Sequence, residues 1–158
     1  MSLLTLFQWL DGLPFNQVLH QSDWASPVNN LLHLLSLVVF AGALVIVDLR
    51  LLGRGLTQEP VAQVARSAQP WLIGGFLGLL LTGIPALTAT AMMQYYNSTF
   101  WWKMDVLLAG LVFTFTVRRR VALADEGRVG HWPRVVVGLV SMGLWAGVAV
   151  SARLIMLL

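Results

Sequence analysis

Residues 31–52 read LLHLLSLVVFAGALVIVDLRLL, an almost unbroken run of apolar side chains. The run is apolar around the whole circumference of a helix, and a helix rises about 1.5 Å per residue. A helix from about residue 28 to 50 therefore crosses the roughly 30 Å hydrocarbon core of a bilayer. Similar runs lie near residues 70–93, 101–118 and 134–157. The sequence predicts an all-α membrane protein with four transmembrane helices.

The composition supports one membrane domain, which we assign to residues 28–158. Of the 158 residues, 58% are hydrophobic and only 11% are charged, against about 25% charged residues in soluble domains. Because cysteine is absent, disulfides, cysteine-ligated zinc, iron–sulfur clusters and cysteine nucleophiles are excluded. Phosphate-binding glycine loops, HExxH and GxSxG motifs are also missing, so we expect a protein that is not an enzyme by itself.

The basic residues predict the orientation in the membrane. Eight of the ten Lys and Arg residues lie in or beside the first and third connections: Arg50, Arg54, Arg66, Arg118, Arg119, Arg120, Arg128 and Arg134. The positive-inside rule places these connections in the cytoplasm. The segment before residue 28 has no Lys or Arg, so we expect both termini on the periplasmic side of a bacterial inner membrane. The arginines are then topology signals, and the expected partners are membrane lipids with other membrane subunits or a second copy, not nucleic acid.

Residues 1–27 are predicted to form a periplasmic-side amphipathic segment. Thr5, Gln8 and Asp11 share one stripe of a helical wheel, whereas Leu6 and Phe7 belong to the apolar remainder. A helix with this pattern lies along a membrane surface.

Proline and glycine predict how the spanning helices start and pack. Pro70 stands at the expected start of the second helix, and Pro85 inside it is expected to kink the helix. The two outward-running helices carry glycine pairs at a spacing of four, which allows close approach of neighbouring helices. These pairs are Gly74 with Gly78, and Gly143 with Gly147.

The chain resembles a family of small bacterial four-helix membrane proteins of unknown function. The resemblance rests on LLHLL around His33, DLRLLG at 48–53, QPWLIGGFLGLLLTG at 69–83 and FWWKMDVLLAG at 100–110, and it covers most of the chain. It implies roles for His33, Asp48, Arg50 and Lys103. The layout is loosely similar to copper-resistance D-type and cytochrome b561-like membrane proteins. Many relatives carry a histidine near the inner end of the third helix, where this chain reads TFTVRRR, so an inner-side haem or metal site is not implied.

His33 is the main candidate for chemistry because an ionisable group inside a spanning helix is a functional candidate by default. It serves helix packing, contacts a ligand such as a quinone, or transfers a proton. Lys103 and Asp105 open the third helix on the same outer side. Residues two apart on a helix point about 200° apart, so one of them faces the protein. We expect His33, Lys103 and Asp105 to form an outer-side ligand-binding site in which Asp105 pairs with the imidazole.

Three methionines, Met92, Met93 and Met104, are expected at the same depth as His33. Thioether and imidazole groups suit copper(I) and haem iron. The leading hypothesis is a small membrane subunit associated with electron transfer, whose site around His33 contacts a quinone or a haem b. A quinone fits better, since a bis-histidine haem needs a second buried histidine. The alternatives are a periplasmic-side copper binding or transport protein and a purely structural accessory subunit.

Asp48 and Arg50 lie about 22 Å along the helix axis from His33 and cannot share its site. We expect them to form an ion pair at the inner surface with the arginines of the third connection.

Overall fold

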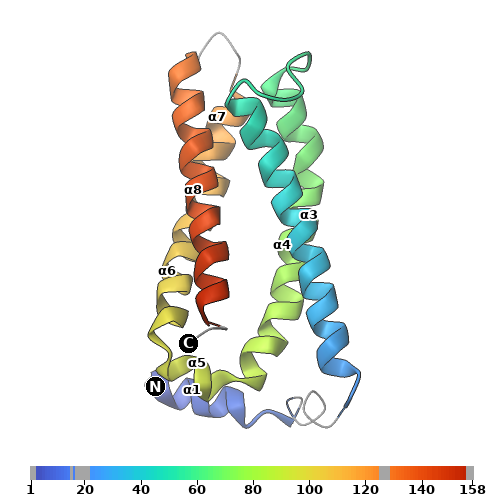
Figure 1. Cartoon of the computed structure of the whole chain (residues 1–158), viewed down its shortest axis with the longest axis vertical. Helices are drawn as coiled ribbons and strands as arrows, with labels where there is room; N and C mark the ends of the chain where they lie inside the picture. Colours follow the sequence, from blue (N-terminus) through green and yellow to red (C-terminus); the bar gives the residue numbers. More distant parts are fainter. Residues whose placement is uncertain (1–2, 15, 17–21, 125–128, 156–158) are drawn as a thin grey trace.

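The computed structural model describes residues 3–14, 16, 22–124 and 129–155. These residues form helices and short connections, with no β-strand among them, which confirms the all-α fold (Figure 1). The helices are α1 (Leu3–Asp11), α3 (Ala25–Leu51), α4 (Val61–Ala89), α5 (Ala91–Tyr96), α6 (Ser98–Phe113), the π-helical turn η1 (Thr114–Arg118), α7 (Arg119–Leu123) and α8 (His131–Ile155).

Three described helices are long and apolar enough to cross a membrane: α3, α4 and α8. They leave many large apolar side chains exposed, including Val38, Leu81 and Leu139. Side chains of this kind are solvated by lipid rather than by water. The structure therefore indicates a membrane protein, as the composition predicts.

The third predicted span, residues 101–118, falls on α6 and η1. The turn η1 continues directly into α7, because Thr114 and Arg119 at its ends have right-handed helical torsions. Figure 1 shows α6 and α7 stacked in one column beside α8. The widened turn divides this column, and α6 alone has 16 residues.

The helix α4 begins nine residues earlier than predicted. Pro70 lies inside α4, so its predicted place at the helix start is wrong. Residues 61–69 contain Gln and Arg, so they do not form an unbroken apolar run. Their side of α4 is nevertheless core, since Val61, Val64 and Ala68 are buried at helical spacing. Pro85 lies inside α4 as predicted.

The predicted amphipathic helix is present as α1, which lies across one end of the bundle beside α5 (Figure 1). Its Phe7 is buried, and the Phe7 ring centroid lies 5.3 Å from Tyr95 and 5.9 Å from Trp101. The Asn16 side chain donates hydrogen bonds to backbone oxygens of Leu10, Asp11 and Thr88. The end of α1 is thus attached to α4. Residues 15 and 17–21 of the predicted segment 1–27 lie outside the described residues.

The main apolar core lies toward the opposite end, where α3 ends and α7 lies (Figure 1). It joins Phe40, Val47 and Leu51 of α3 to Leu72 of α4 and Val137 of α8. Phe40 also contacts the Trp145 indole edge-on, with ring centroids 4.7 Å apart.

The glycine prediction is half correct. A Cβ atom at Gly78 would collide with the Ser36 side chain of α3, and one at Gly147 would lie 3.4 Å from Val106 of α6. Gly74 and Gly143 have nothing of the described chain within 4 Å of such an atom, so their predicted helix contacts are wrong.

The backbone of α3 also approaches α4 closely at Gly75. A Cβ atom there would lie 2.7 Å from the Phe40 backbone nitrogen. Adjacent residues on a helix differ by about 100° in direction. The face that meets α3 therefore contains Gly75 and leaves Gly74 outside.

Candidate functional site

The imidazole of His33 lies between α3 and α4 and is half-buried. Its Nδ1 atom is 2.7 Å from Oγ1 of Thr82. The prediction that the third spanning helix supplies the hydrogen-bond partner of His33 is therefore wrong. The partner is an uncharged hydroxyl of α4. Its hydrogen bond offsets the free-energy cost of placing a polar ring in an apolar region.

The Thr82 hydroxyl determines which way this hydrogen bond runs. Oγ1 lies 2.7 Å from both the Gly78 carbonyl oxygen and His33 Nδ1, and its single proton serves one of them. Because the carbonyl oxygen can only accept, we assign the hydroxyl proton to it and Nδ1 of His33 as the donor to Oγ1. In a neutral imidazole with Nδ1 protonated, the Nε2 atom holds a lone pair. Among the described residues none donates a hydrogen bond to Nε2, so His33 presents an acceptor.

Two further residues position this pair. Asn29, one turn before His33 on α3, donates from Nδ2 to the Thr82 backbone oxygen at 3.0 Å. A Cβ atom at Gly83 would lie 3.4 Å from Cε1 of His33, so the absence of a side chain lets the ring rest against α4. Sequence reasoning from ionisable side chains does not identify Asn29, Thr82 and Gly83, because none of them carries a charge. The four-residue spacing of Asn29 and His33 was the available signal.

Lys103 approaches the same site from α6. It is half-buried. The hydrogen-bond partner of His33 is Thr82, so a joint site of His33 and Lys103 stays a prediction. Asp105 is exposed on α6, and the imidazole bonds Thr82 instead of its carboxylate. The predicted pairing of Asp105 with His33 is wrong because Asp105 lies on the other side of α6 from Lys103.

The three methionines are distributed around the α1 end of the bundle. Met92 and Met104 pack against the cluster of Phe7, Ala91 and Phe100, whereas Met93 is 66% exposed. Within the described ranges, no three His, Asp or Glu side chains gather closely enough to hold a metal ion. A metal site at His33, Met92, Met93 and Met104 stays a prediction.

A second polar cluster lies at the other end of α3. Asp48 Oδ1 is 2.6 Å from Arg118 Nε, and Asp48 Oδ2 accepts from the Ser141 hydroxyl at 2.7 Å. Arg118 also donates from Nη2 to the Leu44 backbone oxygen. This confirms the predicted ion pair between Asp48 and the arginines of the third connection. Sequence reasoning missed Ser141, a small hydroxyl within an apolar span.

Arg50 does not share this cluster. Its Nε donates to the backbone oxygen of Glu59 at 2.7 Å, which ties the end of α3 to the connection before α4. The aspartate is buried and the arginine faces the surface because residues two apart on a helix point in nearly opposite directions.

Long apolar helices that enclose a polar contact between His33 and Thr82 define a helical membrane protein with an intramembrane polar site. The sequence profile of a family of unknown function, DUF6644, matches residues 24–157, and the chain belongs to this family. The matched region contains both polar clusters and leaves out α1. No curated protein and no solved structure matches the chain.

Proposed function

We propose that the protein is a small subunit of the bacterial inner membrane, associated with electron transfer, that binds a quinone at His33. The observation that carries the proposal is the hydrogen bond from Nδ1 of His33 to Thr82, which leaves Nε2 as an acceptor. A quinol hydroxyl is a donor that suits this atom. Lys103 supplies the complementary group, because its ammonium donates to a quinone carbonyl oxygen.

The arrangement suits both redox forms of one ligand. The reduced form has hydroxyl donors and is recognised by the Nε2 lone pair, while the oxidised form has only acceptors and is recognised by Lys103. A ligand headgroup that reaches both His33 and Lys103 therefore finds an acceptor for the quinol form and a donor for the quinone form. The apolar surroundings of α3 and α4 match the apolar tail of such a ligand.

Haem b suits the described residues less well than a quinone. Bis-histidine ligation needs two imidazoles near each other. The described histidines are His33 and His131, and His131 opens α8 near Gly53, at the other end of α3. Copper binding at the methionines and a purely structural role are the other possible outcomes of the experiment below.

For the orientation, we propose four crossings with both termini on the periplasmic side. The third crossing is the column of α6, η1 and α7, which at about 1.5 Å per residue exceeds the roughly 30 Å hydrocarbon thickness. The helix α1 lies along the periplasmic surface. The basic residues of the first and third connections support this orientation.

The test is the content of the purified protein. Quinone is extracted with solvent and quantified by chromatography, the absorption spectrum shows any Soret band, and elemental analysis shows copper. We expect bound quinone in the wild type and in His131→Ala, and at least about tenfold less in His33→Ala, the loss that removing one hydrogen bond to a ligand gives. His131 is the matched control because it is exposed.

A Soret band or stoichiometric copper that disappears in His33→Ala would replace the quinone with the corresponding cofactor. Normal insertion of His33→Ala with no ligand in any variant would contradict the proposal and favour the structural role.

A further inference from the structure

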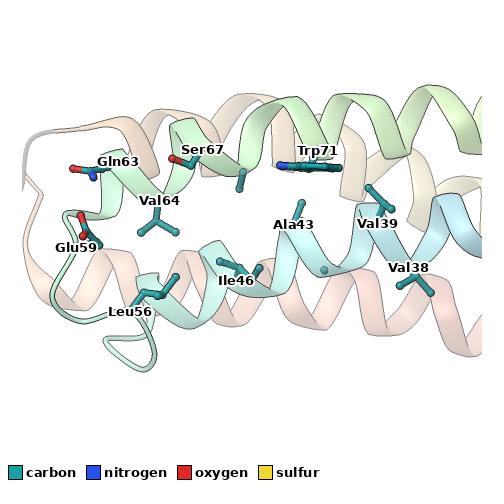
Figure 2. Close-up of a pocket in the computed structure, with 12 residues that line it drawn as sticks. Val38, Val39, Ala43, Ile46, Leu56, Glu59, Gln63, Val64, Ser67 and Trp71 are labelled. Atoms are coloured by element: carbon teal, nitrogen blue, oxygen red, sulfur yellow. The ribbon is translucent and has the colours of Figure 1, made fainter.

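The outer surface of α3 and α4 contains a groove with a volume of about 520 Å³. Figure 2 shows its apolar walls, with Val39 of α3 facing Trp71 of α4 toward one end and Glu59 and Gln63 at the other. The lining also includes Val38, Gly42, Ala43, Ile46, Leu56, Val64, Ser67 and Ala68. The polar side chains are Glu59, Gln63 and Ser67, so the groove has a polar mouth at the connection between α3 and α4.

Small residues keep the groove open. A Cβ atom at Gly42 would have no neighbour of the described chain within 4 Å, and Ala43 and Ala68 fill little of the space between the helices. From Val38 to Ile46 the groove follows α3 for eight residues, about 12 Å of helix axis. Because its walls are apolar and face lipid, a hydrocarbon chain is the occupant that matches them.

The mouth is held in a fixed conformation. Leu56 has a φ of +45°, a left-handed backbone that is unfavourable for a leucine. The connection is held there by the hydrogen bond from Arg50 Nε to the Glu59 backbone oxygen at 2.7 Å. Leu56 lines the groove and is exposed. The unfavourable backbone conformation of Leu56 therefore places an apolar side chain at the mouth of the groove.

The charges at the mouth identify the headgroup. Glu59 lines the groove with an exposed carboxylate, and the Arg50 guanidinium lies against the Glu59 backbone. Glu59 is the charged side chain among the lining residues, so a cationic headgroup complements the mouth. An ammonium that donates hydrogen bonds pairs with Glu59, while the Gln63 amide donates to a phosphate oxygen.

We propose that this groove binds one phosphatidylethanolamine molecule, with an acyl chain between α3 and α4 and its ammonium at Glu59. Phosphatidylcholine has no N–H to donate to the carboxylate, and phosphatidylglycerol brings a net negative charge to it. The site differs from the proposed quinone site, which lies on α3 toward the α1 end. The proposal therefore does not depend on the quinone.

The test is native mass spectrometry of the purified full-length protein, mixed in detergent with equal amounts of the three phospholipids with identical acyl chains. We expect the wild type to retain phosphatidylethanolamine about two- to fivefold more than either competitor, the preference that one exposed ion pair supports. Glu59→Gln should abolish the preference and keep general lipid binding. A Cβ atom at Gly42 has free space, so Gly42→Leu should fill part of the groove and reduce retention of all three lipids.

Gly74→Leu is the matched control. Gly74 also has free space around it but does not line the groove, so this variant should retain lipid as the wild type does. Equal retention of the three headgroups by the wild type, or unchanged retention in Gly42→Leu, would overturn the proposal. A loss of the same size in Gly74→Leu would also overturn it, because it would show nonspecific lipid contact.

Discussion

Arg118 and Asp48 form a buried ion pair that joins the π-helical turn η1 to α3, with Nε and Oδ1 2.6 Å apart. Both side chains are at most 5% exposed. The remaining carboxylate oxygen accepts from Ser141 of α8, so one charge pair connects three helices. The turn is one residue wider than an α-helical turn, and π turns of this kind are found at functional or specially packed positions.

Removing one partner of this pair should destabilise the protein strongly. Asp48→Leu leaves the Arg118 guanidinium buried without its counterion, which costs about 3–5 kcal/mol. The measurement is thermal unfolding in detergent. Arg119→Gln is the control because Arg119 is exposed, and it should unfold at the wild-type temperature.

Replacing both partners separates charge from packing. Asp48→Leu with Arg118→Met removes the unpaired charge and should recover most of the lost stability, because apolar replacement of a whole buried pair is often neutral. A double variant as unstable as Asp48→Leu alone would show that the pair stabilises the bundle through its own attraction.

Gly75 should be the least replaceable glycine of α4. Gly75→Ala places a Cβ atom against the Phe40 backbone, and overpacking of this kind costs about 1–3 kcal/mol. Gly74→Ala adds the same atom in free space and should change stability by less than about 0.5 kcal/mol. Unfolding in detergent measures both, and equal midpoints would contradict the observed approach of α3 and α4.

The packing of α1 against the rest of the protein should depend on the buried ring of Phe7. Phe7→Ala removes the contacts with Tyr95, Phe100 and Trp101, at a cost of about 3–5 kcal/mol for a buried phenylalanine. Amides of residues 3–11 should then exchange hydrogen at least about tenfold faster. Trp9→Ala is the control because Trp9 is 60% exposed; the same acceleration in both variants would contradict the packing of α1.

Much of the fold could be predicted because the apolar runs follow directly from lipid as the solvent. The start of α4 could not be predicted in this way. Residues 61–69 mix polar side chains with a buried stripe, so a criterion based on an unbroken apolar run excludes them although Val61 and Val64 belong to the core. The spacing of Gly74 and Gly78 likewise shows that two glycines share a side of the helix, without showing where α3 crosses it.

The candidate site was predicted in part. The similar depth of His33 and Lys103 follows from counting residues along two helices that run in the same direction. A contact between the two stays a prediction. The partner of His33 could not be predicted in this way, because Thr82 is uncharged and α4 contains a second threonine, Thr88. The Asp48 pair was more predictable, since an acidic residue near the C-terminal end of α3 needs a cation, and the arginine run that begins at Arg118 lies in the third predicted connection.

The topology should be visible with reporter fusions. Fusions after Pro60 and after Ala124 should report the cytoplasm, and a fusion after Asn97 should report the periplasm. The last result requires that the column of α6, η1 and α7 crosses the membrane. A cytoplasmic signal at Asn97, or a periplasmic signal at Pro60 or Ala124, would contradict the four-crossing arrangement.

The most direct measurement of the central claim is the ¹⁵N NMR spectrum of histidine-labelled protein in lipid nanodiscs, recorded before and during titration with a quinol. The arrangement of Thr82 and Gly78 predicts that His33 is protonated at Nδ1 and has the lone pair on Nε2, and that the quinol shifts the Nε2 signal in the wild type. In Thr82→Val the Nδ1 partner is lost, and quinol binding should weaken. A wild-type His33 protonated at Nε2 in the neutral form, or an Nε2 signal unmoved by saturating quinol, would contradict the account.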